Sequence, residues 1–172
     1  TAVETNIHWP TDSSLLWDVY RVLARLIGNV RKFDTDVVGK KRLRLKNAKK
    51  LASKIARYSS NKKHAAKKRV KRLYKKLIKL VESIIAWCSS IKIAIQEALD
   101  NNRYDVITYV MAVAVVEDIK HYTHLGNQVV EQATLRVLKG EKVPNDEKLF
   151  SIFEPHTELL MRGKQNKHIE FG

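Results

Sequence analysis

The chain of 172 residues carries 33 lysines and arginines against 18 aspartates and glutamates, a formal net charge of +15. Its apolar fraction of 44% is ordinary for a folded protein and argues against disorder throughout the chain. Cys88 is the only cysteine, which excludes an internal disulfide and makes a reducing cytoplasm the expected location. We expect Cys88 to be a small core residue rather than a nucleophile.

The N-terminal part predicts an extended segment that leads into a helix. Thr1–Ile7 alternates weakly between apolar and polar residues. Pro10 is followed by three residues that can cap a helix, and we interpret Asp12 as one of these caps. Apolar residues then recur at three- and four-residue spacing, which predicts an amphipathic helix to about Arg31.

A concentrated basic block follows. Between Gly39 and Val81 the chain has nineteen lysines and arginines and no acidic residue, so the remaining residues sum to −4. Such a block attracts a polyanion, and duplex DNA is the first candidate because its phosphate array rewards many cations at once. A solvated charged face is the alternative interpretation. The expected DNA contacts are Lys40, Lys41, Arg42, Arg44, Lys49, Lys50, Lys67, Lys68, Arg69, Lys71, Arg72 and Lys75.

Two further helices are predicted within and after this block, over residues 40–58 and 63–99. The longer one has a heptad pattern of apolar residues, which favours coiled-coil-like packing. The positions of this pattern are Val70, Tyr74, Leu77, Val81, Ile84, Cys88, Ile91 and Ile95. Leu73, Leu80 and Trp87 add a flanking stripe.

A fourth helix is predicted from Tyr104 to Leu138, with a bend at Gly126 and Gly140 as its C-terminal cap. Only a short turn separates it from the preceding helix, so the two should form an antiparallel hairpin onto which the helix over residues 40–58 folds back. The apolar run Val106–Val116 is too short to span a bilayer, and we predict a buried helix and no membrane partner.

The chain becomes extended again after Pro144. Leu149–Phe153 predicts a strand, residues 162–167 a turn, and His168–Gly172 a second extended segment. Both ends are interpreted as cuts through a larger structure. The expected division is an extended piece over residues 1–11, a helical basic unit over 12–143, and a return to strands over 144–172.

Both flanks of the helical unit resemble the catalytic domain of DDE-type transposases of bacterial insertion sequences. The matching blocks are residues 1–16 (TAVETNIHWPTDSSLL), residues 148–159 (KLFSIFEPHTEL), Arg162-Gly163-Lys164 and Glu170-Phe171-Gly172. The resemblance implies a mainly α chain, in which an antiparallel helical bundle is inserted between short extended pieces of a truncated RNase H-like α/β core. It also implies a role in DNA transposition, with transposon ends or target DNA as the partner and association with the nucleoid.

In such transposases three acidic residues on the sheet hold two divalent ions, Mg²⁺ in the complete parent, which suits DNA strand cleavage and transfer. The family pattern places these residues before Thr1 and after Gly172. The resemblance therefore implies no catalytic residue and no metal ligand in this chain, and the chain alone is expected to be inactive.

Two local clusters contain residue types that can bind metal ions. Glu117, His121 and His124 share a helix face at adequate spacing for an ion, but chance placement on a solvated helix is the favoured interpretation. Glu154, His156 and Glu158 would share one face of a strand, as outer support for the missing metal site or as a solvated face.

The aromatic residues favour packing over base stacking at most positions. Trp17 and Trp87 lie within predicted helices, and the heptad position of Tyr74 argues for packing, whereas Tyr58 is better placed to meet DNA. Two rival functions stay open beside the transposase fragment. One is a freestanding basic helical module that binds nucleic acid, and the other is an interaction protein that forms a homo-oligomer through its heptad pattern.

Overall fold

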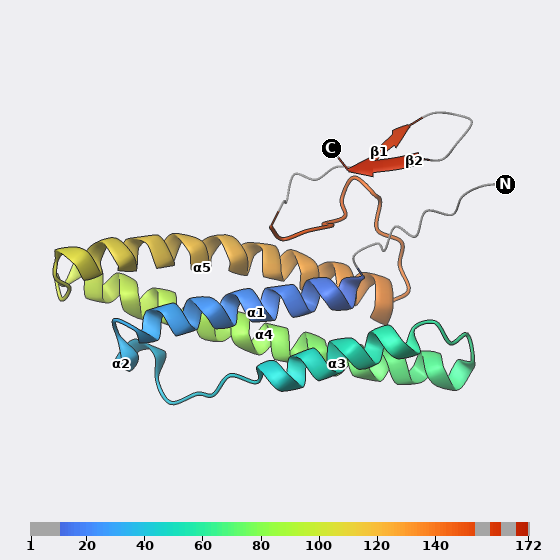
Figure 1. Ribbon diagram of the computed structural model, residues 1–172, viewed down its shortest axis with the longest axis horizontal. Helices are drawn as coiled ribbons and strands as arrows, with labels where there is room; N and C mark the ends of the chain where they lie inside the picture. Colours follow the sequence, from blue (N-terminus) through green and yellow to red (C-terminus); the bar gives the residue numbers. More distant parts are fainter. Residues whose placement is uncertain (1–10, 154–158, 163–167, 172) are drawn as a thin grey trace.

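The computed structural model describes residues 11–153, 159–162 and 168–171, and it confirms a mainly helical chain (Figure 1). Four long helices form a bundle, a short helix connects the first two of them, and a π-helical turn continues the last. In chain order these are α1 (Asp12–Arg31), α2 (Thr35–Val38), α3 (Leu45–Tyr58), α4 (His64–Asp100), α5 (Val106–Ala133) and η1 (Thr134–Leu138).

Helix α1 lies in the middle of the bundle, where it contacts α3, α4 and α5. It begins at the predicted place, but its cap is Thr11, whose hydroxyl oxygen Oγ1 accepts a hydrogen bond from Ser14 N at 3.2 Å. The expectation that Asp12 is the cap is therefore wrong. Asp12 is the first helical residue and is buried.

The heptad pattern of α4 is confirmed as the spine of the core. From Tyr74 to Ile95 every position of the pattern is buried, and Val70 at its start is half-buried. Helices α4 and α5 run antiparallel and are joined by a tight turn, and α3 folds back along the first half of α4 (Figure 1). This arrangement uses the heptad pattern within one chain, so it is not free to join copies of the chain.

The helix predicted over residues 40–58 begins only at Leu45. Residues 40–44 are irregular because their backbone groups bind side chains of α1 instead of one another: Arg31 Nη2 donates to Lys41 O and Arg44 N donates to Tyr20 Oη, both at 2.9 Å. Gly39 ends α2 with a φ of +73°, a conformation that favours glycine.

Helix α5 runs through Gly126 without the expected bend. A Cβ at this position would lie 2.9 Å from Val19 Cγ1 and 3.1 Å from Ile85 Cδ1, so glycine allows α1, α4 and α5 to approach closely. The helix ends in η1, after which Gly140 has a φ of +68° and Glu141 N donates to Leu135 O. Gly140 is thus the C-terminal cap that its position predicts.

The first half of α5 corrects another expectation. Residues 106–116 are helical, but they are not buried: Val106 is 81% exposed, Ile107 74% and Val110 62%. In this stretch Ala112 and Val115 are buried, and Val116 packs against the core. The apolar run predicts a helix that is buried on all sides, whereas the other helices described in this structure cover it on one side.

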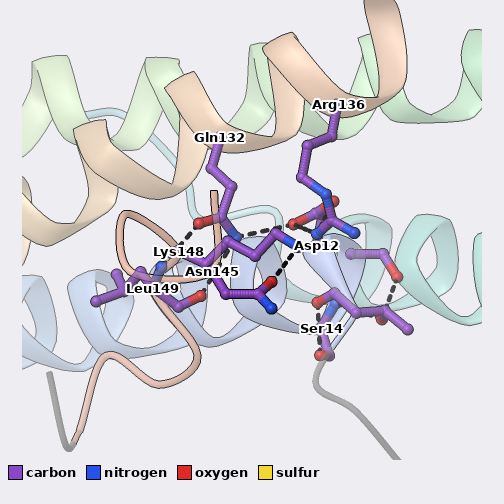
Figure 2. A network of polar contacts seen from close by, with 9 residues as sticks. Asp12, Ser14, Gln132, Arg136, Asn145, Lys148 and Leu149 are labelled. Atoms are coloured by element: carbon purple, nitrogen blue, oxygen red, sulfur yellow. Dashed lines mark hydrogen bonds and ion pairs between the residues drawn. The ribbon is translucent and has the colours of Figure 1, made fainter. Parts of the chain in front are cut away.

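A polar network at one end of the bundle joins the start of α1 to the end of α5 and to the segment that follows η1 (Figure 2). The buried carboxylate of Asp12 accepts hydrogen bonds from Gln132 Nε2 and Arg136 Nη1, both at 3.0 Å. Gln132 also accepts from Leu149 N at 2.8 Å and donates to Leu149 O at 3.2 Å. The strand predicted over Leu149–Phe153 is therefore wrong: this segment pairs with a side chain, and Ile152 inserts into the core at 1% exposure.

Two short strands follow, β1 (Leu159–Arg162) and β2 (His168–Phe171), and they pair antiparallel with Leu160 opposite Glu170. Strand β2 confirms the second extended segment predicted there. Within residues 11–153, 159–162 and 168–171 this pair is the whole sheet, so an RNase H-like core is not part of the described structure. The turn predicted over residues 162–167 begins in the structure with the last residue of β1, Arg162, and its remaining residues, like residues 1–10 including Trp9, lie outside the described part of the chain.

Candidate nucleic-acid interface

The twelve residues predicted to contact DNA are all exposed, and three consecutive parts of the chain carry them. Lys40, Lys41, Arg42 and Arg44 lie in the irregular segment 40–44, Lys49 and Lys50 lie on α3, and the remaining six lie on the first turns of α4. Helices α3 and α4 pack side by side, and these parts follow one another along one side of the bundle, away from α5 (Figure 1).

The segment 40–44 is held in place although it has no regular structure. Besides the segment's own bonds to Arg31 and Tyr20, Val38 is held two residues before it, since Trp87 Nε1 donates to Val38 O at 3.0 Å. The guanidinium of Arg31 lies over the Trp87 ring, 5.7 Å from its centroid. These contacts from α1 and α4 position four cationic side chains that would otherwise lie on a free loop.

A groove runs between α3 and α4, and lysines from both helices line it. Lys50 and Lys54 come from α3, and Lys76 and Lys79 from α4, while Leu51, Leu73 and Leu80 belong to its lining at the helix contact. The leucines lie at the helix contact, and the four lysines place positive charges on both sides of the groove. Positive charge on both sides suits a ligand that carries repeated negative charge.

A second hollow adjoins the groove at Leu80, which lines both. Lys41, Arg42 and Arg44 line this hollow together with Tyr20 and Trp87. The groove and the hollow therefore form one continuous basic surface from the segment 40–44 to the middle of α4. We call it the basic surface below.

The cations at the start of α4 lie on two different sides of the helix. Arg69, Arg72, Lys76 and Lys79 follow one another at three- and four-residue spacing, so they form one stripe along the helix. Lys67 and Lys71 lie on the opposite flank, because each residue advances about 100° around an α-helix. The start of the stripe faces α3, since the Arg69 guanidinium lies 4.2 Å from the centroid of the Tyr58 ring.

Sequence reasoning missed three of the four groove lysines, Lys54, Lys76 and Lys79. The signal that could have found them is the leucine stripe of α4: Leu73 and Leu80 flank the buried heptad positions and mark the side on which α3 packs. Cations next to that stripe face α3, and cations across the helix from it do not.

The positive charges of this surface are not neutralised by ion pairs within the described part of the chain. The two salt bridges found there join Arg21 to Asp18 and Arg136 to Asp12, and neither involves a residue of the block between Gly39 and Val81. Nineteen cations with no acidic neighbour in sequence therefore stay available to a polyanion.

The aromatic residues mostly pack, as predicted. Trp87 and Tyr74 are buried, and Trp17 packs against the core. Burial raises the pKa of the Tyr74 hydroxyl, and hydrogen bonding to Ser13 partly offsets this rise. Tyr58 is half-buried and faces Arg69, so the ring that was expected to meet DNA already has a cationic partner. Burial also raises the pKa of the Cys88 thiol to about 12, which confirms a core residue.

No metal site emerges from the residues that the structure describes. Glu117, His121 and His124 do not converge, and no other group of three Asp, Glu, His or Cys side chains in that part of the chain could hold an ion. Glu154, His156 and Glu158 lie outside the described residues.

No helix in the described part of the chain is both long enough and apolar enough to cross a membrane. In comparisons with known proteins, no family model, curated protein or solved structure matches this chain.

Proposed function

We propose that this chain binds duplex DNA through its phosphate backbone, with the basic surface on α3, α4 and the segment 40–44 as the contact. The observation that carries this proposal is the unneutralised cationic block arranged as a groove with lysines on both edges. A lysine ammonium contacts phosphate as a point charge and releases a counterion, so the affinity gained is largely independent of base sequence.

The biological setting that we propose is transposition of an insertion sequence, in which the helical unit holds DNA near a catalytic core. The support is the resemblance of both flanking segments to DDE-type transposases. The bundle contributes to this interpretation because Asp12 and Leu149, which begin and follow it, meet through Gln132. A unit with adjacent ends can lie between two strands of a sheet without separating them.

A freestanding basic module that binds nucleic acid is the alternative, and one observation favours it. The core of the bundle is formed by residues between Leu15 and Ile152 and needs no further sheet to be buried. The flanking coding sequence distinguishes the two. A transposase predicts an aspartate directly before Thr1 and two acidic residues after Gly172.

The salt dependence of DNA binding tests the proposed contact. If the basic surface neutralises about six phosphates, the logarithm of the binding constant should fall with the logarithm of salt concentration at a slope near −5. Replacing Lys50, Lys54, Lys76 and Lys79 with glutamine should weaken that slope by about three to four, because each lost phosphate contact removes about 0.9. Fluorescence anisotropy of a labelled duplex, over a series of salt concentrations, measures it.

The matched control removes the same charge from outward positions, with glutamine at Lys46, Lys49, Lys68 and Lys75. These lysines are exposed and do not line the groove. If both quadruple variants change the slope equally, only net charge matters and the groove is not the contact. If a base-scrambled duplex binds much more weakly than the first, backbone recognition is wrong.

A further inference from the structure

The apolar first half of α5 is the largest feature that DNA binding leaves unexplained. Between Asp105 and Glu117 the chain has no charged residue, and the exposed side of this stretch carries large apolar side chains. These are Val106, Ile107, Tyr109, Val110, Met111 and Val113, each between 40% and 81% exposed. Ile93 on α4, at 59% exposure, adds to them. We call this set the α5 patch.

A patch of this kind is unusual on a surface in contact with water. Helices that are apolar on all sides are normally covered, and clusters of exposed large apolar residues mark interaction sites. Six neighbouring side chains on about two turns of one helix do not fit the scatter of single exposed residues that is ordinary for monomers. The question is therefore which molecule covers the patch.

We infer that the α5 patch is the interface through which two copies of this chain form a symmetric dimer. The remainder of a longer chain is a poor occupant, because it would enter at the far end of the bundle. Asp12 and Leu149 meet at one end, whereas Tyr104, just before α5, donates to Asp34 Oδ2 at the other. The intervening α1 has 20 residues and a length of about 30 Å.

The distribution of charge favours a second copy at this position. The basic surface lies on the segment 40–44, α3 and the first half of α4, on the side of the bundle away from α5, while the α5 patch lies beside the turn that joins α4 to α5 (Figure 1). Two copies repel each other through their basic surfaces. Contact through the patch keeps these surfaces apart.

The charges that end the patch favour an antiparallel pairing of the two α5 helices. Glu117 and Asp118 follow the apolar run directly, and both are exposed. In a parallel pair these carboxylates would face their own copies. In an antiparallel pair whose axis lies near Val110, the two copies of Glu117 are about 21 Å apart along the helices, because each is seven residues from the axis at about 1.5 Å per residue. The twofold axis then passes near Val110, and the interface is made of the same residues from both copies.

Sedimentation at high salt, on protein freed of nucleic acid, measures the oligomeric state without bridging by DNA. We expect the wild-type chain to be a dimer whose dissociation follows mass action. Val110→Glu should raise the dissociation constant by roughly tenfold or more, because it would bury an unpaired carboxylate at the axis. The matched control is Asn127→Glu, which adds the same charge at an exposed position further along α5 and should leave the dimer intact.

Two measurements keep the test independent of folding. Both glutamate variants should retain the helical circular dichroism and melting temperature of the wild type, since Val110 is exposed in this structure. In a second test, Val110→Cys should form a disulfide-linked dimer under mild oxidation, whereas Asn127→Cys should not. Cys88 does not interfere, because it is buried and its pKa is raised to about 12.

The inference is overturned if the wild-type chain is monomeric at every concentration. It is also overturned if Val110→Glu and Asn127→Glu dissociate alike, or if the monomer instead binds vesicles of neutral lipid through the patch. None of these outcomes depends on DNA binding, so the dimer and the proposed function stand or fall separately.

Discussion

Asp12 is the one buried aspartate or glutamate within residues 11–153, with 6% of its surface exposed. Its two partners come from 120 and 124 residues later in the chain. An ionised carboxylate in such a place is tolerated because Gln132 and Arg136 both donate hydrogen bonds to it. The Arg136 side chain is 37% exposed, so water screens part of the attraction.

Asp12→Ala should lower the free energy of unfolding by about 1–3 kcal/mol, because it leaves the amide of Gln132 without its buried acceptor. Urea denaturation measures the change. The control is Asp18→Ala, which breaks the exposed pair with Arg21 and should cost about 0–1 kcal/mol. Equal losses for the two variants would show that the network at Asp12 contributes no more than a surface ion pair.

Several residue-scale features could not have been predicted from neighbouring sequence. Pro10 and Thr11 indicate the start of a helix, but nothing in the sequence near Asp12 indicates the distant side chains that donate hydrogen bonds to it. The irregular conformation of residues 40–44 likewise depends on Tyr20, which lies 24 residues before its partner Arg44. A capping pattern depends on neighbouring residues and can be predicted from them. A tertiary hydrogen bond depends on residues far away in the sequence and cannot be predicted in this way.

The two glycines within long helices have opposite roles. Gly28 in α1 has nothing within 4 Å of the place where a Cβ would lie, whereas Gly126 in α5 faces Val19 and Ile85 at close range. The same substitution at the two positions should therefore change stability in opposite directions.

Gly28→Ala should stabilise the chain by about 0.5–1 kcal/mol, the ordinary gain in helix propensity. Gly126→Ala should destabilise it, because overpacking against the stiff side chain of Val19 costs about 1–3 kcal/mol and outweighs a helix gain of about 1 kcal/mol. Thermal or urea unfolding measures both. A stabilising Gly126→Ala would mean that the three helices are less tightly packed than this structure shows.

At the scale of elements, periodicity predicted α1, α4 and their burial well. The heptad positions of α4 report burial directly, because apolar residues recur on the side that packs. The exposed face of α5 was not predictable in the same way: the run Val106–Val116 indicates that the helix needs cover, but not that this cover lies outside the bundle. The strand predicted over Leu149–Phe153 failed for a related reason, since its apolar residues are held by Gln132 and the core rather than by a sheet.

The sequence predicts which part of the chain is basic, but not which of its lysines line the groove between α3 and α4. Composition alone locates nineteen cations between Gly39 and Val81. Which of them face the groove depends on the rotation of α4 against α3, and that is a property of the packed pair. Lys76 and Lys79 therefore became candidates only once the groove was seen.

At the scale of the whole molecule, the basic block should weaken the folded state in the absence of a polyanion. Uncompensated charges repel one another, and salt screens them: the screening length falls from about 30 Å at 0.01 M to about 10 Å at 0.1 M. We expect the melting temperature to rise with sodium chloride over this range. Glutamine at Lys68, Lys71 and Lys75 should raise it at low salt and reduce its dependence on salt. A melting temperature that falls as salt is added would contradict this account.

The long span between Asp12 and its partners also orders events during synthesis. Helix α1 leaves the ribosome first, but Gln132 follows 120 residues later, which at about 5–20 residues per second is a delay of roughly 6 to 24 seconds. The antiparallel pairs α3–α4 and α4–α5 need only short loops and can close much sooner. The nascent chain thus holds an uncovered face of α1 until α5 arrives, and the bond between Asp12 and Gln132 is among the last contacts to form.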